Sequence, residues 1–254
     1  AGAAIGQRRE LIADPAAEAN EAPENEAEAG PLPGTSDLPG QLLRELCHQL
    51  GLDPACVMPA CDDPRQRASL TLGEPVAWVL PLLREDIAGL RRWRTSPWPL
   101  AELNRGTAFE EQAPLLLVAG DSAAGYRLPM HQLPWPSPKE IAEGSGLVRT
   151  AVSAEWRKGR LHCFLPPVPV ADDWLQLVAA VENAAAAVNE PVVLEGYPAP
   201  SSPSLRRLQV TPDPGVIEVN VPPAASWSEL VALRTTLEGE ARASRLCAEK
   251  FERS

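Results

Sequence analysis

The chain of 254 residues lacks the marks of several common protein classes. No apolar run approaches the roughly 20 residues that a membrane-spanning helix requires, and the first residues lack the basic-then-apolar pattern of a signal peptide. An excess of positive charge is absent as well, since 34 acidic and 23 basic residues give a formal net charge of -11. Nucleic acids and anionic membranes both require cations that neutralise phosphates. We therefore expect a cytoplasmic protein with no nucleic-acid partner and no membrane partner.

Fingerprints of familiar enzymes and of cysteine-based sites are also missing. The sequence contains no Walker loop, no G-x-G-x-x-G and no nucleophile elbow. Its five cysteines have neither the paired short spacing of zinc sites nor the density of a disulfide scaffold, so reduced thiols are expected. Ser122 follows a strand-like run, and His131 lies nearby in the sequence. A serine hydrolase is therefore a less favoured hypothesis, because Gly, Asp and Ser also form turns.

Proline, with 28 residues, is abundant, and composition divides the chain into three parts. Residues 1–38 are rich in Ala, Glu and Pro without apolar periodicity, which predicts a disordered acidic linker. Residues 39–145 are predicted to form a Pro/Trp-rich module that begins with a short helix ending at Gly51. Trp93 and Trp98 lie among arginines there, and packing against the protein is favoured over stacking on nucleic-acid bases.

Residues 146–254 alternate strand and helix patterns. Strands are predicted in 148–156 and 159–167, joined by a tight turn at Lys158 and Gly159, and further strands in 191–197, 206–213 and 215–221. One helix is predicted to be capped by Asp172 or Asp173, and a second by Ser226 with Glu229 in a capping box. This order predicts an α+β fold with a mixed, largely antiparallel sheet and helices on one face.

Acidic side chains accompany several of these strands. Glu155, Glu195 and Asp213 lie at or near strand ends, whereas Glu218 and Asn220 alternate with apolar residues in "VIEVNV", typical of a strand with one buried face. Clustered carboxylates are the ligands with which proteins hold Mg²⁺ and its nucleotide phosphates. The alternative is an ordinary solvated face, since the outer face of an antiparallel sheet is usually polar.

Long blocks of the sequence resemble a known family. "TAVSAEWRKGRLHCFLPPV", the region from "PVVLEGY" through "VTPDPGVIEVNVPPAASWSELV", and "ARASRLCAEKF" resemble consecutive blocks of a bacterial amidoligase family of unknown function, whose members are often fused to a transglutaminase-like domain. "LGEPVAWVLPL", "RWRTSPWPL" and "GDSAAGYRLPMHQLPW" resemble the region that precedes those blocks, so the resemblance covers about residues 40–251. The family is similar to glutamine synthetase, which implies part of a glutamine-synthetase-like catalytic sheet in residues 146–254.

The resemblance also implies a reaction and a site. ATP would phosphorylate a small-molecule or peptide carboxylate, and an amine would displace phosphate to form an amide. Glu155 matches the acidic residue of the first catalytic strand, and Asp213, Glu218 and Asn220 match the strand pair that faces Mg²⁺ and nucleotide. The implied metal ligands are Glu155, Asp213 and Glu218. Asp213 and Glu218 would bind the nucleotide, and Glu218 and Asn220 would be catalytic.

The sequence departs from the family pattern in two places. Pro222 stands where the family has a histidine, and "EKFERS" comes before any Gly-rich, His-containing segment of the kind that follows in family members. We therefore expect an incomplete ligase domain, with the rest of a larger polypeptide as a partner. The alternative is a noncatalytic interaction or structural remnant, in which an unpaired sheet edge binds another chain.

Overall fold

The computed structural model describes residues 37–63, 73–87, 89–105, 114–213 and 216–246. The chain divides into two units, Ala1–Pro200 and Ser201–Ser254. The predicted disordered linker, residues 1–38, lies outside the described residues except for its last two. Leu38 begins the first described helix.

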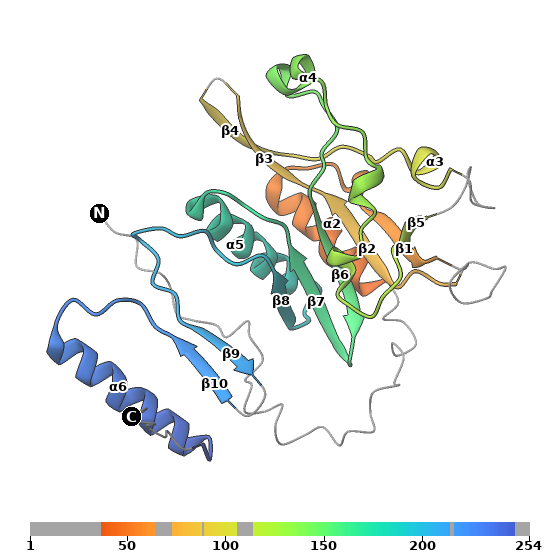
Figure 1. Ribbon diagram of the computed structural model, residues 1–254. Coiled ribbons are helices and arrows are strands. Elements are labelled where there is room, and N and C mark those ends of the chain that lie inside the picture. Colours follow the sequence, from red (N-terminus) through yellow and green to blue (C-terminus); the bar gives the residue numbers. More distant parts are fainter. Residues whose placement is uncertain (1–36, 64–72, 88, 106–113, 214–215, 247–254) are drawn as a thin grey trace. The chain divides into compact units, whose positions relative to one another are not determined.

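A six-stranded sheet forms the centre of the first unit (Figure 1). Its order is β5-β1-β2-β6-β7-β8, in which β1–β2, β2–β6 and β6–β7 are antiparallel and β1–β5 and β7–β8 are parallel. The strands are β1 (Met58–Asp62), β2 (Ala77–Pro81), β5 (Leu115–Leu117), β6 (Ala151–Arg157), β7 (Arg160–Leu165) and β8 (Val192–Gly196). The predicted α+β class with a mixed, largely antiparallel sheet is confirmed.

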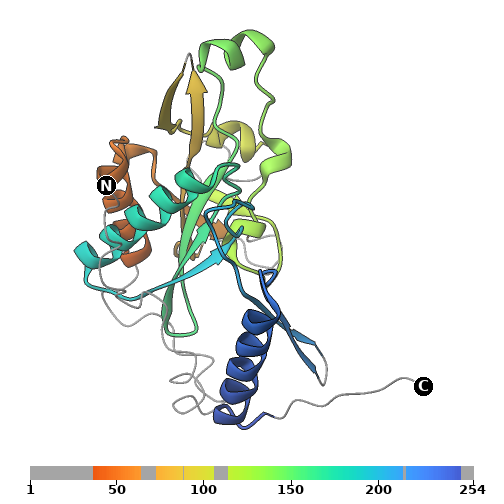
Figure 2. The ribbon, with the colours of Figure 1, turned by 90° about the vertical axis from the view of Figure 1, so that its left-hand side faces the viewer.

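Helices α2 (Leu38–Leu50) and α5 (Ala171–Val188) pack together on one face of this sheet, as Figure 2 shows. The prediction of helices on one face is therefore confirmed. Their shared core is built from alternate residues of the strands together with the apolar stripe of each helix. It includes Leu42, Leu46, Leu80, Val152, Ala154, Leu161, Cys163, Leu177 and Val181. Helix α2 ends at Gly51, as predicted, in the left-handed conformation with φ 67°.

Short elements cover part of the opposite face. They are α3 (Leu100–Leu103) and the 3₁₀ helices η3 (Ala124–Tyr126) and η4 (Met130–Gln132), whereas α4 (Pro138–Glu143) has no buried residue. A second core forms there, where Trp98, Leu103, Ala124, Leu128 and Leu133 pack with Met58, Ala60, Ala77, Val79 and Ala151. Because side chains alternate along β6, Ala151 and Glu155 point away from the α2 and α5 side.

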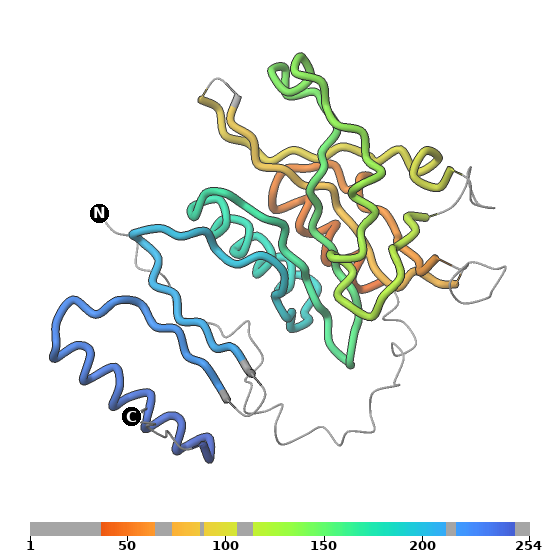
Figure 3. Tube along the Cα trace, viewed as in Figure 1, coloured from red at the N-terminus to blue at the C-terminus, as the bar shows by residue number. Residues whose placement is uncertain are grey.

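The hairpin of β3 (Leu83–Ile87) and β4 (Leu90–Arg94) was not predicted, and Figure 3 traces it beside the sheet. It is tied to α5 by Asp173, which accepts a hydrogen bond from Arg84 Nε at 3.1 Å and one from Arg91. The predicted cap of α5 was therefore wrong. The N-cap residue is Val170, which has no capping side chain, and Asp173 instead binds the hairpin.

Both tryptophans of the Arg/Trp segment pack as predicted. Trp93 and Trp98 are buried, and Trp98 Nε1 donates to the Val148 carbonyl at 2.8 Å. Strand β2 of the predicted Pro/Trp-rich module pairs with β6 of the predicted ligase domain in one sheet. The division of the chain into those two domains stays a prediction.

The second unit contains the antiparallel hairpin of β9 (Gln209–Asp213) and β10 (Val216–Asn220), followed by α6 (Trp227–Ala243). Ser226 caps α6 as predicted, but the Glu229 carboxylate accepts the N–H of Ala225 at 2.7 Å instead of completing the box at Ser226. The expected buried face of β10 is not found, since Ile217 is 47% exposed. No described side chain of residues 201–246 is buried.

Candidate functional site

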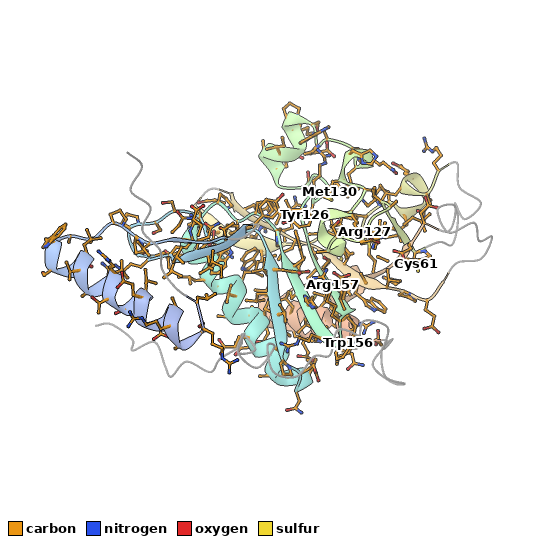
Figure 4. All side chains as sticks on the ribbon, turned by 60° about the horizontal axis from the view of Figure 1, so that its bottom comes forward. Cys61, Tyr126, Arg127, Met130, Trp156 and Arg157 are labelled. Atoms are coloured by element: carbon orange, nitrogen blue, oxygen red, sulfur yellow. The ribbon has the colours of Figure 1, made fainter. Side chains whose placement is uncertain are left out.

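Four polar side chains gather on the face of the sheet opposite α2 and α5. Glu155 and Arg157 extend from β6, His162 from β7 and Glu195 from β8. The strand register places Glu155 opposite His162, and Glu195 opposite Phe164 of β7. We call these four residues the β6–β8 polar cluster; Figure 4 labels Arg157 within it.

Arg157 holds the polar cluster together. Its Nη1 donates to Glu155 Oε1 at 2.6 Å, and its Nη2 donates to Glu195 Oε2 at 2.5 Å. The same Nη2 lies 3.1 Å from His162 Nδ1. One guanidinium therefore links three strands, as the planar, multiply donating side chain of arginine allows.

Glu155 is the most buried carboxylate of the cluster. Its Oε1 also accepts the backbone N–H of Ala124 at 3.2 Å, while Oε2 makes no hydrogen bond in the described part of the chain. Burial raises the pKa of Glu155 above its usual value of 4.5, and the Ala124 and Arg157 contacts only partly oppose this effect. A carboxyl group with a raised pKa in a partly enclosed site is a common property of reaction centres.

The pKa of Glu195 is shifted in the opposite direction, to a lower value. Burial alone would raise its pKa, but the contacts with His162 and Arg157 outweigh burial and hold the pKa below 4.5. The cluster thus contains two carboxyl groups with opposite tendencies. Glu195 favours the ionised form, and Glu155 favours the protonated form more than an ordinary glutamate does.

An aromatic group flanks the polar cluster. Phe164 of β7 contacts Tyr126 of η3 edge-to-face with ring centroids 4.7 Å apart, and Tyr197 in the same manner at 6.2 Å. Gly125 allows η3 to approach, because a Cβ at that position would lie 2.1 Å from Phe164 Cδ1. This close approach places the Ala124 N–H against Glu155.

The second unit carries the other predicted site residues. Glu218 and Asn220 share one face of β10, as predicted, and Asn220 Nδ2 donates to Glu218 Oε1 at 2.8 Å. Asp213 is the last residue of β9 and pairs in register with Val216. Glu155 belongs to the first unit and the other three to the second, so their convergence on one ion stays a prediction.

The described residues contain no group of three or more His, Cys, Asp or Glu side chains that could hold a metal ion. The carboxylates of Glu155 and Glu218 each keep an oxygen free of hydrogen bonds in the described ranges, and such oxygens suit Mg²⁺.

Sequence reasoning missed Arg157 and His162 as site residues. The predicted two-residue turn at Lys158 and Gly159 was enough to place both residues beside Glu155. Such a turn pairs Arg157 with Arg160 and, two residues further along each strand, Glu155 with His162. Alternation then places Arg157 on the same face as Glu155.

The hydrolase hypothesis receives no structural support. Ser122 and His131 are both exposed, and within the described residues the His131 ring contacts Gln132 rather than Ser122. A nucleophilic serine requires a base within hydrogen-bonding distance. Likewise, no helix among the described residues is both long and apolar enough to cross a membrane.

Comparison with known proteins adds one finding. Residues 137–254 match the model of a family described as "Putative amidoligase enzyme (DUF2126)". No curated protein and no solved structure matches the chain. The matched region contains the whole β6–β8 polar cluster as well as Asp213, Glu218 and Asn220. The resemblance to an amidoligase family is therefore confirmed over residues 137–254.

Proposed function

We propose that this chain contributes to an ATP- and Mg²⁺-dependent amidoligase that joins a carboxylate to an amine. The observation that carries the proposal is the β6–β8 polar cluster, in which Glu155, with its raised pKa, is hydrogen-bonded to Arg157 on the face of the sheet opposite α2 and α5. The match of residues 137–254 to an amidoligase family supports the same reaction class.

The proposed reaction has two steps. An oxygen of the substrate carboxylate attacks the γ-phosphorus of ATP, forming an acyl phosphate as the bond to the ADP oxygen breaks. The amine nitrogen then attacks the acyl carbon, inorganic phosphate leaves with the C–O bonding electrons, and the amine releases a proton to the surrounding water. Both steps bring anionic groups together, so rigid strands that carry fixed charges favour them.

Glu155, Asp213 and Glu218 are the residues that would hold Mg²⁺, with Asp213 and Glu218 facing the nucleotide. The ion would offset the repulsion between ATP and the substrate carboxylate. Asn220 orients Glu218 through their hydrogen bond of 2.8 Å. Arg157 keeps Glu155 and Glu195 together on the first unit.

Isothermal titration calorimetry with Mg-ATP tests this function. We expect saturable binding that weakens in Glu218→Ala and Asp213→Ala and also in Glu155→Gln. Glu240→Ala changes an exposed carboxylate of the same unit as Glu218 and should bind as the wild type does. Wild-type protein that shows no binding of Mg-ATP would contradict the proposal.

A noncatalytic interaction module is the second candidate, and one observation favours it. Apolar side chains that the structure describes in the β9–β10 hairpin are exposed, with Val210 at 54% and Ile217 at 47%. Exposed apolar strands commonly mark sites where another chain binds. Multi-angle light scattering separates the candidates. Self-association that Ile217→Lys abolishes, together with absent nucleotide binding, would favour the interaction module.

A further inference from the structure

The imidazole of His162 has an unusual partner. Its Nδ1 lies 3.1 Å from Arg157 Nη2 and 3.4 Å from Glu195 Oε2. These two neighbours demand opposite protonation of Nδ1, because arginine only donates hydrogen bonds and a carboxylate only accepts them. The position of the imidazole proton therefore depends on which contact prevails.

The distances favour the arginine. The contact of Nδ1 with Arg157 is the shorter one, and Glu195 Oε2 already accepts a hydrogen bond from Arg157 at 2.5 Å. When Nδ1 accepts, the proton of the neutral imidazole resides on Nε2. Arg157 thus selects the Nε2–H tautomer of His162.

The Nε2 atom is available to a ligand. It makes no hydrogen bond within the described ranges. The fully buried side-chain nitrogen and oxygen atoms that lack a partner there belong to Trp78, Thr95 and Arg149, so His162 Nε2 is not fully buried. His162 is nevertheless largely enclosed, with a side chain 12% exposed. Its Nε2–H is therefore open to a ligand, and His162 pairs in register with Glu155 on the neighbouring strand.

We infer that His162 is held as the Nε2–H tautomer by Arg157 and donates a hydrogen bond to a phosphoryl oxygen of the bound nucleotide. This inference rests on the proposed ligase function. A neutral donor suits this position, because the phosphoryl group accepts hydrogen bonds and gains no proton during transfer. His162 in this tautomer is a donor and not the base that receives the amine proton.

The first part of the test needs no ligand. Nitrogen-15 NMR of the full chain distinguishes the two tautomers of each imidazole, and the sequence contains only three histidines. We expect the proton of His162 on Nε2 in the wild type and a shift toward Nδ1–H, facing Glu195, in Arg157→Met. Arg234→Met, which removes an exposed arginine, should leave the tautomer of His162 unchanged. A wild-type proton on Nδ1 overturns the inference.

The second part uses Mg²⁺ with the ATP analogue AMP-PNP, with binding followed by calorimetry. At saturation we expect the His162 Nε2–H proton resonance to move, while that of exposed His131 stays in place. Loss of one hydrogen bond to a negatively charged phosphoryl oxygen should weaken binding about ten- to a hundredfold in His162→Ala. His162→Gln, whose amide can donate from a similar position, should bind within about twofold of the wild type, well inside the effect of one lost bond.

The outcomes separate the two proposals. Saturable binding that leaves the His162 resonance unmoved overturns the donor role and leaves the ligase proposal intact. Absence of AMP-PNP binding to the wild type contradicts the ligase proposal and removes the donor role with it. Equal losses of AMP-PNP affinity in His162→Ala and His162→Gln would show that His162 acts through packing, which also overturns the inference.

Discussion

Arg157 on β6 reaches across β7 to Glu195 on β8, and its Nη2 lies 2.5 Å from Glu195 Oε2. The contact joins β6 and β8, which lie on either side of β7. Strand β6 is antiparallel to β7, and β8 is parallel to it. Helix α5 makes the crossover that brings β8 into place, as parallel strand pairs require. The polar cluster therefore depends on the position of β8.

Glu195→Gln should destabilise the first unit at neutral pH by about 1–2 kcal/mol, because a charge-assisted hydrogen bond with Arg157 is lost. The pKa of Glu195 is lowered by folding, so its contribution is present above pH 4.5 and is lost as the pH falls through the folded-state pKa. Urea denaturation at several pH values measures this effect. A difference from the wild type that persists unchanged in acid would contradict the prediction.

Glu155→Gln should show the reverse pH dependence. Because folding raises the pKa of Glu155, the stability that it contributes is fully present below pH 4.5 and is lost as the pH rises through the folded-state pKa. The wild type should therefore lose stability relative to Glu155→Gln as the pH increases from 4.5 toward neutrality. Glu143→Gln, at an exposed position, serves as the control and should track the wild type at every pH.

Arg157→Met should destabilise the first unit by about 2 kcal/mol or more, since two partly buried carboxylates lose their common cation. The matched control is Arg234→Met, which removes an exposed i,i+4 ion pair with Glu238 and should cost at most about 0.5 kcal/mol. Chemical denaturation followed by tryptophan fluorescence provides the measurement. Equal effects of the two substitutions would show that the polar cluster adds nothing to stability.

Asp173→Asn should loosen the β3–β4 hairpin from α5. Its carboxylate is 5% exposed and neutralises Arg84 and Arg91, so removal of the charge leaves Arg84 partly buried without an anion. We expect a loss of about 2–4 kcal/mol. Asp172→Asn changes the exposed neighbour in the same helical turn and should cost less than about 1 kcal/mol. Hydrogen exchange of the hairpin amides should increase only in Asp173→Asn.

Gly125→Ala should destabilise the first unit by about 1–3 kcal/mol, because the added methyl group collides with the buried ring of Phe164. Gly239→Ala is the control, and it should have the opposite effect on stability. Nothing lies within 4 Å of a Cβ at position 239 in α6, and alanine there should stabilise the helix by about 0.5–1 kcal/mol. Thermal unfolding of both variants measures the contrast, and a neutral Gly125→Ala would contradict the packing argument.

Local patterns located most elements of this fold. The hairpin of β6 and β7 follows from two apolar runs around Lys158 and Gly159, and α2 follows from leucines at helical spacing before Gly51. Strand β1 was missed because its sequence, "MPACD", is short and contains Pro59. The β3–β4 hairpin was missed because its charged residues show no alternation of apolar and polar side chains.

The candidate site was only partly visible in the sequence. Glu155 was identified, and the register of a two-residue hairpin would have added His162. Glu195 joins them only through the placement of β8 beside β7, which a long-range crossover decides and local spacing does not. The cap of α5 was misassigned for a similar reason, since the arginines that bind Asp173 are more than eighty residues away in the chain.

Gly196 ends β8 with φ +99°, and a Cβ there would lie 2.5 Å from the Leu165 carbonyl oxygen. Any other residue at this position would force β8 away from β7. The residue just before it is Glu195, so the displacement would pass directly to the carboxylate that Arg157 holds. The spacing of the cluster's charges is thus set by the absence of a single methyl group at the end of a strand, and variation at position 196 would alter that spacing without touching any charged residue.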